Sequence, residues 1–540
     1  MDKEITGNFS IRCCVMFETK KMKIPITIFL FFVFVGVNAK SIYVNPKASS
    51  GNSGMSERQA LKDIQTAALI SEPGDTIWIM GGDYYGTEGS QAIASITKSG
   101  AAENWIVFKN YKEEVPVLHC TNMHGIVLQN VSFISLDGLE IKYEYKVDGE
   151  QADQNNYSGI WMESGSFQVK NSNIQIINNE ISGFGGSAIY LQACSKFTVS
   201  RNKLMNNCRS IKGPSAAIWI KDFLDLEEKK FFKNEIDGNE IFNNVSTSMQ
   251  DYSTGDCITK LPGSGILLEN QDIVLQKLRS ISAQTSISNN VIYKNSGLAI
   301  SVQTTPNLVI ANNTCYKNIV ANASCAELSL FNIMKGAIIN NIIYTNRGKG
   351  GSRSKLLEYV DYKNNLYFNC TDYDKGIGDT LIDPQFMRLD EVRNIYDFRL
   401  KDRSPAINKG ERNHTTLFDF MLNNRTLGPL PDLGAIESDY KFLNTQIYAK
   451  PFIDQKRIKA IWSTNYSSDR DEFTIVNHRG RSFEALLYAF DGALLQRFSS
   501  FHEKGTVLVI SGMDLLPGVY YVRAMNEGES IIGRFVKLKK

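Results

Sequence analysis

The chain has no marked excess of charge of either sign. Its 59 basic and 57 acidic residues leave a formal net charge of +2 over 540 residues. A protein that binds nucleic acid by neutralising phosphates needs a basic surface. The composition therefore argues against a nucleic-acid partner. Aromatic residues, in contrast, make up 11% of the chain, so a sugar-binding surface would have ring faces to draw on.

Long apolar runs are also scarce, and the one that stands out, Ile24 to Val37, lies near the N-terminus. It follows a short basic stretch and ends near a small residue, Ala39, which is the pattern of a signal peptide. The run is short for a transmembrane helix. We expect residues 1–39 to hold an upstream extension and a signal peptide starting at Met22. The mature protein would be secreted or lie on the outer cell surface, with no transmembrane segment.

Metal and redox motifs are missing. Of nine cysteines, Cys13 and Cys14 precede the expected cleavage site, which leaves seven, and no two are spaced as C-x-x-C. A zinc or redox site therefore has little support. An odd number leaves at least one cysteine unpaired, and Cys315 with Cys325 is the short-range pair to test. The five histidines are scattered and indicate no metal site.

What the sequence does contain is repetition. Between Ser158 and Gln303 one pattern returns five times: a small residue, then apolar, variable, apolar and polar positions. This alternation predicts half-buried strands. The residues expected to point inward are Ile160, Ile189, Ile218, Ile266 and Ile300. Those expected to point outward are Trp161, Tyr190, Trp219, Leu267 and Ser301, followed by Glu163, Gln192, Lys221, Glu269 and Gln303.

A second repeat, built on asparagine pairs, is interleaved with the first. Its central residues lie 23, 37, 51, 23 and 28 positions apart, at Asn179, Asn202, Asn239, Asn290, Asn313 and Asn341. A base period in the twenties with insertions predicts a solenoid. Asparagine tolerates left-handed backbone and can form hydrogen-bonded ladders when stacked, so we interpret these pairs as structural.

Both ends of the repeat region resemble a known superfamily. The segments Ile42 to Pro46, Pro73 to Ile77 and Gly81 to Tyr84, with a predicted helix from Ser56 to Ser71, resemble the opening of secreted pectate-lyase-like proteins. Further segments resemble their closing region, so that the similarity covers roughly Ser41 to Glu437: Asp397 to Leu400, Ser404 to Gly410 and Asp432 to Glu437. The resemblance implies an all-β fold, a right-handed parallel β-helix (pectin lyase fold) with an N-terminal helical cap.

The last part of the chain resembles something different. Leu515 to Val522 and Phe535 to Lys540 are similar to the C-terminal sorting domain of the type IX secretion system. This resemblance implies a small β-sandwich and the secretion machinery as a partner; an immunoglobulin-like module of other purpose is the alternative. The expected domains are the N-terminal cap and first coils, the β-helix core, the C-terminal cap with a linker, and the sorting domain, at residues 40–115, 116–372, 373–450 and 451–540.

The repeats also predict where a ligand would bind. Equivalent residues on adjacent coils stand ~4.8 Å apart, so Trp161, Tyr190 and Trp219 would form an aromatic strip on which sugar rings stack. Gln192 and Gln303 would add hydrogen-bonding groups beside it. The alternative is that the strip lies under a loop and is ordinary packing.

The distances expected between coils limit which candidate catalytic residues can act together. Glu163 and Glu269 would be three coils apart, ~14 Å, too far for a glycosidase pair, so that a hydrolase would need a loop carboxylate such as Asp222. A lyase needs a base and a cation, and Lys221 is the cation of the polar row. Because Glu269 would make Lys221 a poorer base, Lys221 would bind the substrate carboxylate while Glu269 or a tyrosine moves the proton. A plain salt bridge remains the alternative.

The sequence therefore predicts a carbohydrate-active protein, with a polysaccharide lyase acting on an acidic polysaccharide as the first hypothesis. A glycoside hydrolase on the same fold and a non-catalytic glycan-binding or surface protein are the alternatives. No cofactor is evident. Calcium stays open, although no cluster of aspartates resembles the site of the calcium-dependent β-helix lyases, and the arginine–lysine signature of alginate and chondroitin lyases is not recognised either.

Overall fold

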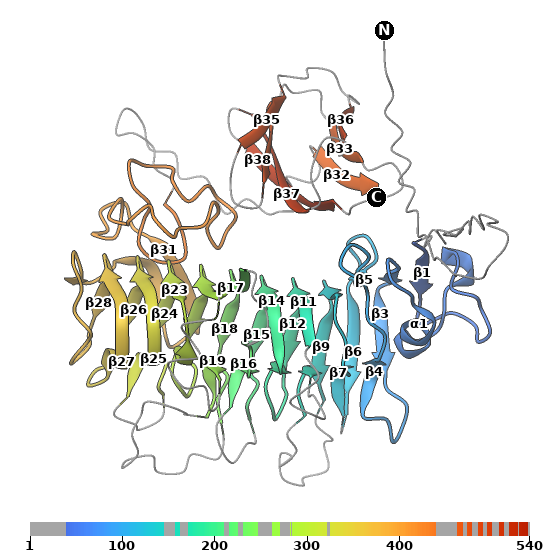
Figure 1. The fold of residues 1–540 in the computed structure, drawn as a ribbon, viewed down its shortest axis with the longest axis horizontal. Helices are drawn as coiled ribbons and strands as arrows, with labels where there is room; N and C mark the ends of the chain where they lie inside the picture. The colour runs from blue at the N-terminus through green and yellow to red at the C-terminus, as the bar shows by residue number, and fades with distance from the viewer. Residues whose placement is uncertain are drawn as a thin grey trace, which may run out of the picture. The chain divides into compact units, whose positions relative to one another are not determined.

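The structure is a computed structural model. It describes residues 39–121, 123–144, 157–162, 171–209, 215–224, 231–246, 262–270, 281, 283–320 and 325–438, together with the backbone of seven strands between Trp462 and Lys537. Short strands wind into a long parallel β-helix (Figure 1), followed by small antiparallel sheets. Helix is confined, within these residues, to one α-helix and one 3-10 turn. The fold class expected from the sequence is confirmed.

The strands of the β-helix form three series of parallel pairings, which we call the first, second and third faces. The first face runs from β4 (Ala92–Ile96) through β7 (His124–Leu128), β10 (Ile160–Met162), β13 (Ile189–Gln192), β16 (Ala216–Lys221), β19 (Ser264–Glu269) and β22 (Ile300–Thr305) to β25 (Ala326–Ile339) and β27 (Gly350–Lys363). β25 and β27 are long enough to continue into the second face.

The other two faces complete each coil. The second consists of β1 (Ser41–Val44), β2 (Thr76–Ile79), β5 (Ile106–Asn110), β8 (Ile134–Asp137), β11 (Asn171–Ile177), β14 (Cys194–Ser200), β17 (Phe232–Asp237), β20 (Ala283–Ser288) and β23 (Leu308–Ala311). The third consists of β3 (Gly82–Tyr85), β6 (Pro116–Cys120), β9 (Glu140–Tyr143), β12 (Glu180–Ser182), β15 (Lys203–Met205), β18 (Glu240–Phe242), β21 (Val291–Tyr293), β24 (Thr314–Tyr316), β26 (Ile342–Tyr344), β28 (Leu366–Phe368) and β29 (Thr380–Leu381).

The isoleucine repeat forms the core of the first face in the register that the sequence predicts. Ile160 pairs with Ile189, Ile189 with Ile218, and the series continues through Ile266 to Ile300. All five side chains are fully buried. Each coil thus covers the apolar surface of its neighbour, which is how a solenoid escapes the size limit of a single core.

The asparagine pairs form the predicted ladder. From Asn179 to Asn365 each side-chain amide donates to the amide oxygen of the asparagine one coil further on, at 2.9–3.1 Å. The same oxygen also accepts the backbone N–H of the asparagine that donates its amide. The buried polar groups of each coil are thus satisfied by the next coil. A second ladder at the next turn joins Asn207, Asn244, Asn295 and Asn318.

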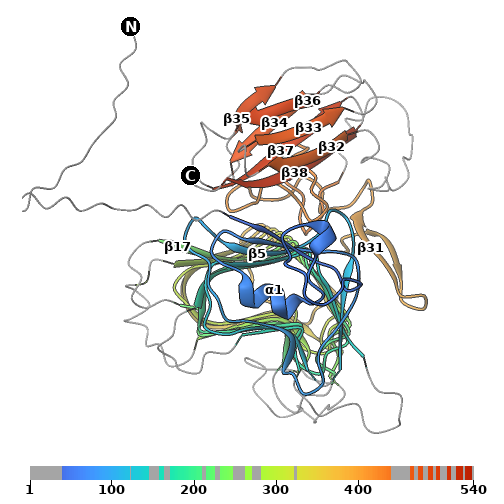
Figure 2. The same cartoon turned by 90° about the vertical axis from the view of Figure 1, so that its right-hand side faces the viewer.

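The N-terminal helix is shorter than predicted. α1 spans Ile64–Ile70 with Asp63 as its N-cap, whose carboxylate accepts the Thr66 N–H at 2.7 Å. Ser56 caps only the 3-10 turn η1 (Glu57–Gln59) and makes no side-chain cap bond. Between them Leu61 pairs with Val44 of β1, and this pairing interrupts the helix. Figure 2 shows α1 lying across the end of the β-helix.

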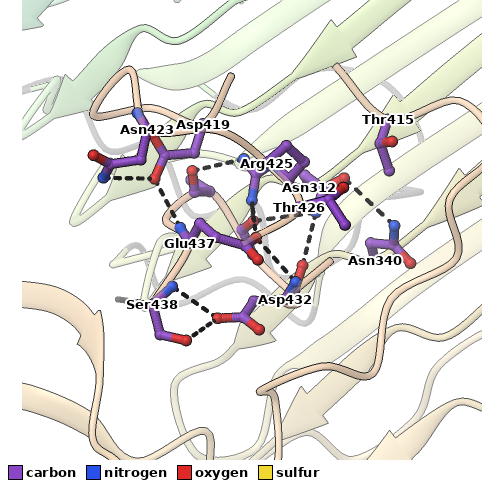
Figure 3. Close-up of polar contacts among 12 residues, drawn as sticks. Asn312, Asn340, Thr415, Asp419, Asn423, Arg425, Thr426, Asp432, Glu437 and Ser438 are labelled. Carbon is purple, nitrogen blue, oxygen red and sulfur yellow. Dashed lines mark hydrogen bonds and ion pairs between the residues drawn. The ribbon is translucent and has the colours of Figure 1, made fainter. Parts of the chain in front are cut away.

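The closing region of the β-helix is held by a buried arginine. The Arg425 guanidinium donates to the carbonyls of Gly434 at 3.0 Å and Ala435 at 2.8 Å, and to Asn289 of the β-helix. Glu437 lies 3.7 Å from the guanidinium (Figure 3). A hairpin of β30 (Phe386–Asp390) and β31 (Ile395–Leu400) packs its rings against tyrosines of the third face.

The C-terminal strands form two antiparallel sheets. One contains β32 (Trp462–Ser467), β33 (Glu472–Asn477) and β36 (Val507–Ser511), and the other contains β35 (Leu494–Phe498), β34 (Glu484–Ala489), β37 (Gly518–Asn526) and β38 (Glu529–Lys537). β34 and β35, which are consecutive in the chain, pair antiparallel. Among the described residues, no helix is long and apolar enough to span a membrane.

The disulfide considered between Cys315 and Cys325 is wrong. Cys325 is disulfide-bonded, whereas Cys315 is a free thiol that is fully buried beneath the third face. Cys120, Cys194 and Cys208 are also free and buried. They fill space in the core as small apolar side chains, which is the common use of free cysteine.

Candidate functional site

Three aromatic rings line up on the outer side of the first face. Trp161 on β10, Tyr190 on β13 and Trp219 on β16 share one register position on successive coils, and each is partly exposed. The ring centroids of Trp161 and Tyr190 are 6.4 Å apart at 21°, and those of Tyr190 and Trp219 are 5.2 Å apart at 77°. The row of aromatic rings that the repeat predicts is therefore present. We call these rings the aromatic strip.

The same register position is covered on both sides of the strip. Val127 one coil before Trp161 is 1% exposed, and Leu267 and Ser301, one and two coils after Trp219, are also 1% exposed. The expectation that Leu267 and Ser301 face solvent is therefore wrong, although their register is as predicted. Between Val127 and Ser329, the accessible members of this column are its three aromatic residues.

A fourth ring, which the sequence analysis missed, extends the strip. The imidazole of His124, at the start of β7, stacks on Trp161 with centroids 4.8 Å apart and planes 19° apart. A signal was available, because Gly125 to Gln129 fits the same small–apolar–variable–apolar–polar pattern as the five repeats. Ile126 indeed pairs with Ile160. His124 precedes this unrecognised copy.

The polar row that follows the strip is also in register. Gln192 pairs with Lys221, Lys221 with Glu269 and Glu269 with Gln303, on β13, β16, β19 and β22. Gln192 accepts a hydrogen bond from the Tyr190 hydroxyl at 3.1 Å, which ties the row to the strip. Glu163, expected to begin this row, lies outside the described residues.

Lys221, Glu269 and Trp219 form one cluster at the end of the strip. The Lys221 Nζ lies 3.8 Å from the Glu269 Oε1, and the same oxygen accepts a hydrogen bond from the Trp219 Nε1 at 3.1 Å. The ammonium also lies 5.6 Å from the centre of the Trp219 ring, within cation–π range. The carboxylate thus orients both the lysine and the indole.

Burial distinguishes the two charges of this pair. The Lys221 side chain is 19% exposed, whereas that of Glu269 is 2% exposed. Within the pair, then, it is the ammonium that a solvent-borne ligand reaches. A buried ion pair is poor evidence of stabilisation in itself, because desolvation offsets its attraction. The catalytic roles of Lys221 and Glu269 stay predictions.

Asp222 marks the corner at which β16 ends. Its φ is +53°, and it is partly exposed next to Lys221, while its backbone N–H donates to the Glu269 carbonyl at 2.8 Å. Ala193, at the equivalent corner one coil earlier, also has a positive φ. The structure places Asp222 beside the cluster, and its role as a hydrolase carboxylate stays a prediction.

Metal ligands do not gather at this site. Nowhere in the described part of the chain do three or more histidine, cysteine, aspartate or glutamate side chains lie close enough to share a metal ion. Calcium binding thus stays a prediction for this protein.

Comparison with known proteins agrees with this architecture. The family model described as "Pel9A-like, right handed beta helix region" matches residues 42–217. The fold is that of the pectate lyase β-helix. A pectate disaccharide-lyase of Dickeya chrysanthemi is 30% identical over 113 residues, which are 21% of this chain and 13% of that protein. The match thus covers only a small part of that relative's length.

Solved structures of similar shape include a pectate lyase, Pel9A, and a rhamnogalacturonan lyase. The first has a TM-score of 0.46 at 16% identity, covering 74% of this chain and 97% of its own. The second has a TM-score of 0.35 at 13% identity, covering 68% and 96%.

Proposed function

We propose that this protein is a polysaccharide lyase that acts on an acidic polysaccharide, secreted or held on the outer cell surface. The observation that carries the proposal is the aromatic strip on the first face, which leads along the β-helix axis to the ammonium of Lys221. The match to the Pel9A-like β-helix region and to part of a pectate disaccharide-lyase supports the same chemistry.

The strip supplies a surface for the sugar chain. Trp161 and Trp219 are two coils apart, roughly 10 Å at the interstrand spacing, so that consecutive sugar rings can lie along the axis. Aromatic faces bind sugars through apolar contact area. Gln192 and Gln303, partly exposed beside the strip, are placed to hydrogen-bond hydroxyl groups.

Lys221 supplies the charge that elimination needs. A uronate carboxylate paired with the ammonium would carry the negative charge that develops when the neighbouring carbon loses its proton. The electron pair then forms the new carbon–carbon double bond, and the glycosidic oxygen leaves and takes up a proton. A positioned base contributes typically about 10²–10⁴-fold to such a step.

Two groups are candidates for that base. Glu269 lies against Lys221 but is 2% exposed and engaged with Trp219, so it needs a small displacement to reach substrate. The Tyr190 hydroxyl is one coil away on the strip itself. We assign Glu269 the role of holding Lys221 and Trp219 in place. Tyr190, as its phenolate, would take the proton from carbon, and the phenol so formed would give it to the leaving glycosidic oxygen.

A glycoside hydrolase is the second candidate. The partly exposed Asp222 follows Lys221 directly, and its backbone N–H donates to the carbonyl of Glu269 on the next coil. A retaining glycosidase needs two carboxylates about 5–5.5 Å apart, a separation that the side chains of Asp222 and Glu269 would have to reach. The two reactions give different products, which makes the choice testable.

The same proposal includes export through the type IX secretion system. It rests on the resemblance of the C-terminal segments, and the antiparallel sheets formed by β32 to β38 are compatible with a sorting domain. Deletion of residues 451–540 would then leave the protein inside the outer membrane, while the intact chain reaches the cell surface or the medium.

The deciding experiment is a substrate screen of the purified mature chain, starting at Lys40. We expect polygalacturonate or another uronate polymer to yield products that absorb in the ultraviolet through the new double bond, and neutral xylan to yield none. Reducing ends without ultraviolet absorbance would establish the hydrolase instead. Binding without any product would leave a glycan-binding protein and contradict the proposed reaction.

A further inference from the structure

His124 begins the strip at the end remote from Lys221. It lies on β7, and Lys221 lies on β16, three coils further on, or ~14 Å along the axis. Its ring is stacked on Trp161 and partly exposed, so a sugar chain lying on the strip would meet it. The proposed lyase mechanism assigns no role to His124.

The hydrogen bond to Ser158 fixes which ring nitrogen carries the proton. The Ser158 backbone N–H donates to His124 Nδ1 at 3.0 Å, so Nδ1 is an acceptor. A neutral imidazole with an acceptor at Nδ1 carries its hydrogen on Nε2. Nε2–H is therefore left to donate a hydrogen bond outside this contact.

The surroundings of the ring keep it neutral. Burial lowers the pKa of His124 to about 4. The ring also packs edge-on against Tyr157, with centroids 5.3 Å apart. Among the described residues, Tyr157, Ser158 and Trp161, which contact the ring, are uncharged.

We propose that His124 is a sugar-binding residue, whose stacked neutral ring donates a hydrogen bond from Nε2 to a hydroxyl group of the polysaccharide. This rests on the proposed function. The binding surface along the aromatic strip then has two unlike ends, a neutral donor at His124 and an ammonium at Lys221. A sugar chain has a direction, and unlike ends select one of its two orientations on the strip.

Two variants separate the donor from the ring. His124→Phe keeps a stacked ring and removes the N–H, whereas His124→Gln removes the ring and keeps an N–H donor near the position of Nε2. A net hydrogen bond is worth roughly 0.5–1.5 kcal/mol, or up to about tenfold. We expect His124→Phe to raise KM for tetragalacturonate about 5- to 10-fold with kcat unchanged, and His124→Gln to recover part of this loss.

A second measurement does not depend on turnover. Imidazole nitrogen NMR of the full mature chain would show His124 as the Nε2–H tautomer without titration between pH 5 and 8, with a shift of Nε2 when tetragalacturonate is added. Tyr85→Ala is the matched control, because Tyr85 is an exposed ring stacked on His119 on the third face. It should change neither KM nor this signal.

The outcomes distinguish the two proposals. If Trp219→Ala raises KM and His124→Phe does not, or if His124 titrates between pH 5 and 8, the role of His124 is overturned while the lyase proposal stands. If the wild-type chain neither binds nor cleaves tetragalacturonate or any other uronate oligomer, both proposals fail together.

Discussion

At the residue scale, neighbours decide what each polar side chain can do. Glu269 and Gln303 occupy equivalent positions one coil apart, yet Glu269 is 2% exposed and tied to Trp219, whereas Gln303 is partly exposed. The repeat pattern alone placed both in the outward polar row, Glu269 as a candidate catalytic residue and Gln303 as a candidate substrate-binding residue. The contacts of Glu269 assign it to positioning, while the side chain of Gln303 is the more accessible of the two.

Glu327 is a core residue whose properties are also set by its neighbours. It occupies the position that the small residue Ala299 has one coil earlier, and it is fully buried. One carboxyl oxygen accepts from Asn318 at 2.9 Å at the end of the second asparagine ladder, and the other has no hydrogen-bond partner. Burial raises the pKa of Glu327 from 4.5 to about 8, so the folded protein favours its neutral form.

Glu327 therefore predicts a pH dependence of stability. Because the pKa of Glu327 is higher in the folded protein than in the unfolded chain, its contribution to the free energy of unfolding is fully present below pH 4.5. That contribution is lost as the pH rises through about 8. Glu327→Gln keeps the shape and cannot ionise. One pKa unit corresponds to about 1.4 kcal/mol. The free energy of unfolding of Glu327→Gln, relative to that of wild type, should therefore rise by a few kcal/mol between pH 5 and 9.

Denaturant unfolding of the two proteins at several pH values measures this difference. Other buried carboxyls, such as Glu437 with a pKa of about 8, are common to both proteins and cancel in the comparison. An advantage of Glu327→Gln that stays constant with pH would show that Glu327 does not titrate in this range.

At the element scale, the asparagine ladders are the clearest case of one residue type specifying local structure. Asn239 is fully buried, its side-chain oxygen accepts from both the backbone and the side chain of Asn202, and its amide group donates to Asn290 and Val199. The ladder therefore couples three successive coils through a single side chain.

Removing one rung should be costly. Asn239→Ala leaves the Asn202 N–H and its amide without their acceptor, and we expect a loss of about 2–4 kcal/mol of unfolding free energy. Asn413→Ala, an exposed asparagine in the closing region, is the control and should change it by less than about 0.5 kcal/mol. Equal losses in a denaturant titration would refute the structural role of the ladder.

The elements also show what sequence patterns can and cannot predict. Period-two alternation placed Ile160 to Ile300 inward, because alternation is a local property of a strand. It could not place Leu267 or Ser301, since their burial depends on what lies over them. The helix from Ser56 was predicted too long because Leu61 pairs with a strand that is distant in sequence.

At the scale of the whole molecule, stacking of coils turns a short repeat into an extended surface. The register that buries the isoleucines also sets Trp161, Tyr190 and Trp219 at regular intervals beside the row from Gln192 to Gln303. His124 escaped prediction because the copy of the repeat that follows it, Gly125 to Gln129, carries Val127 where the next three copies carry an aromatic ring and was not recognised. The binding surface is thus a consequence of the fold, and the reaction depends on the few side chains that the strip leads to.

The most direct test of this account is the rate at which Lys221→Ala produces unsaturated sugars from the polysaccharide that the wild-type chain cleaves. Loss of a residue that stabilises the developing charge predicts a fall in kcat of at least about 100-fold, measured at a temperature at which the variant is shown to be folded. Glu269→Gln, which keeps the hydrogen bond from Trp219, should retain more activity than Lys221→Ala. A Lys221→Ala protein that is folded and turns over at the wild-type rate would contradict the site proposed here.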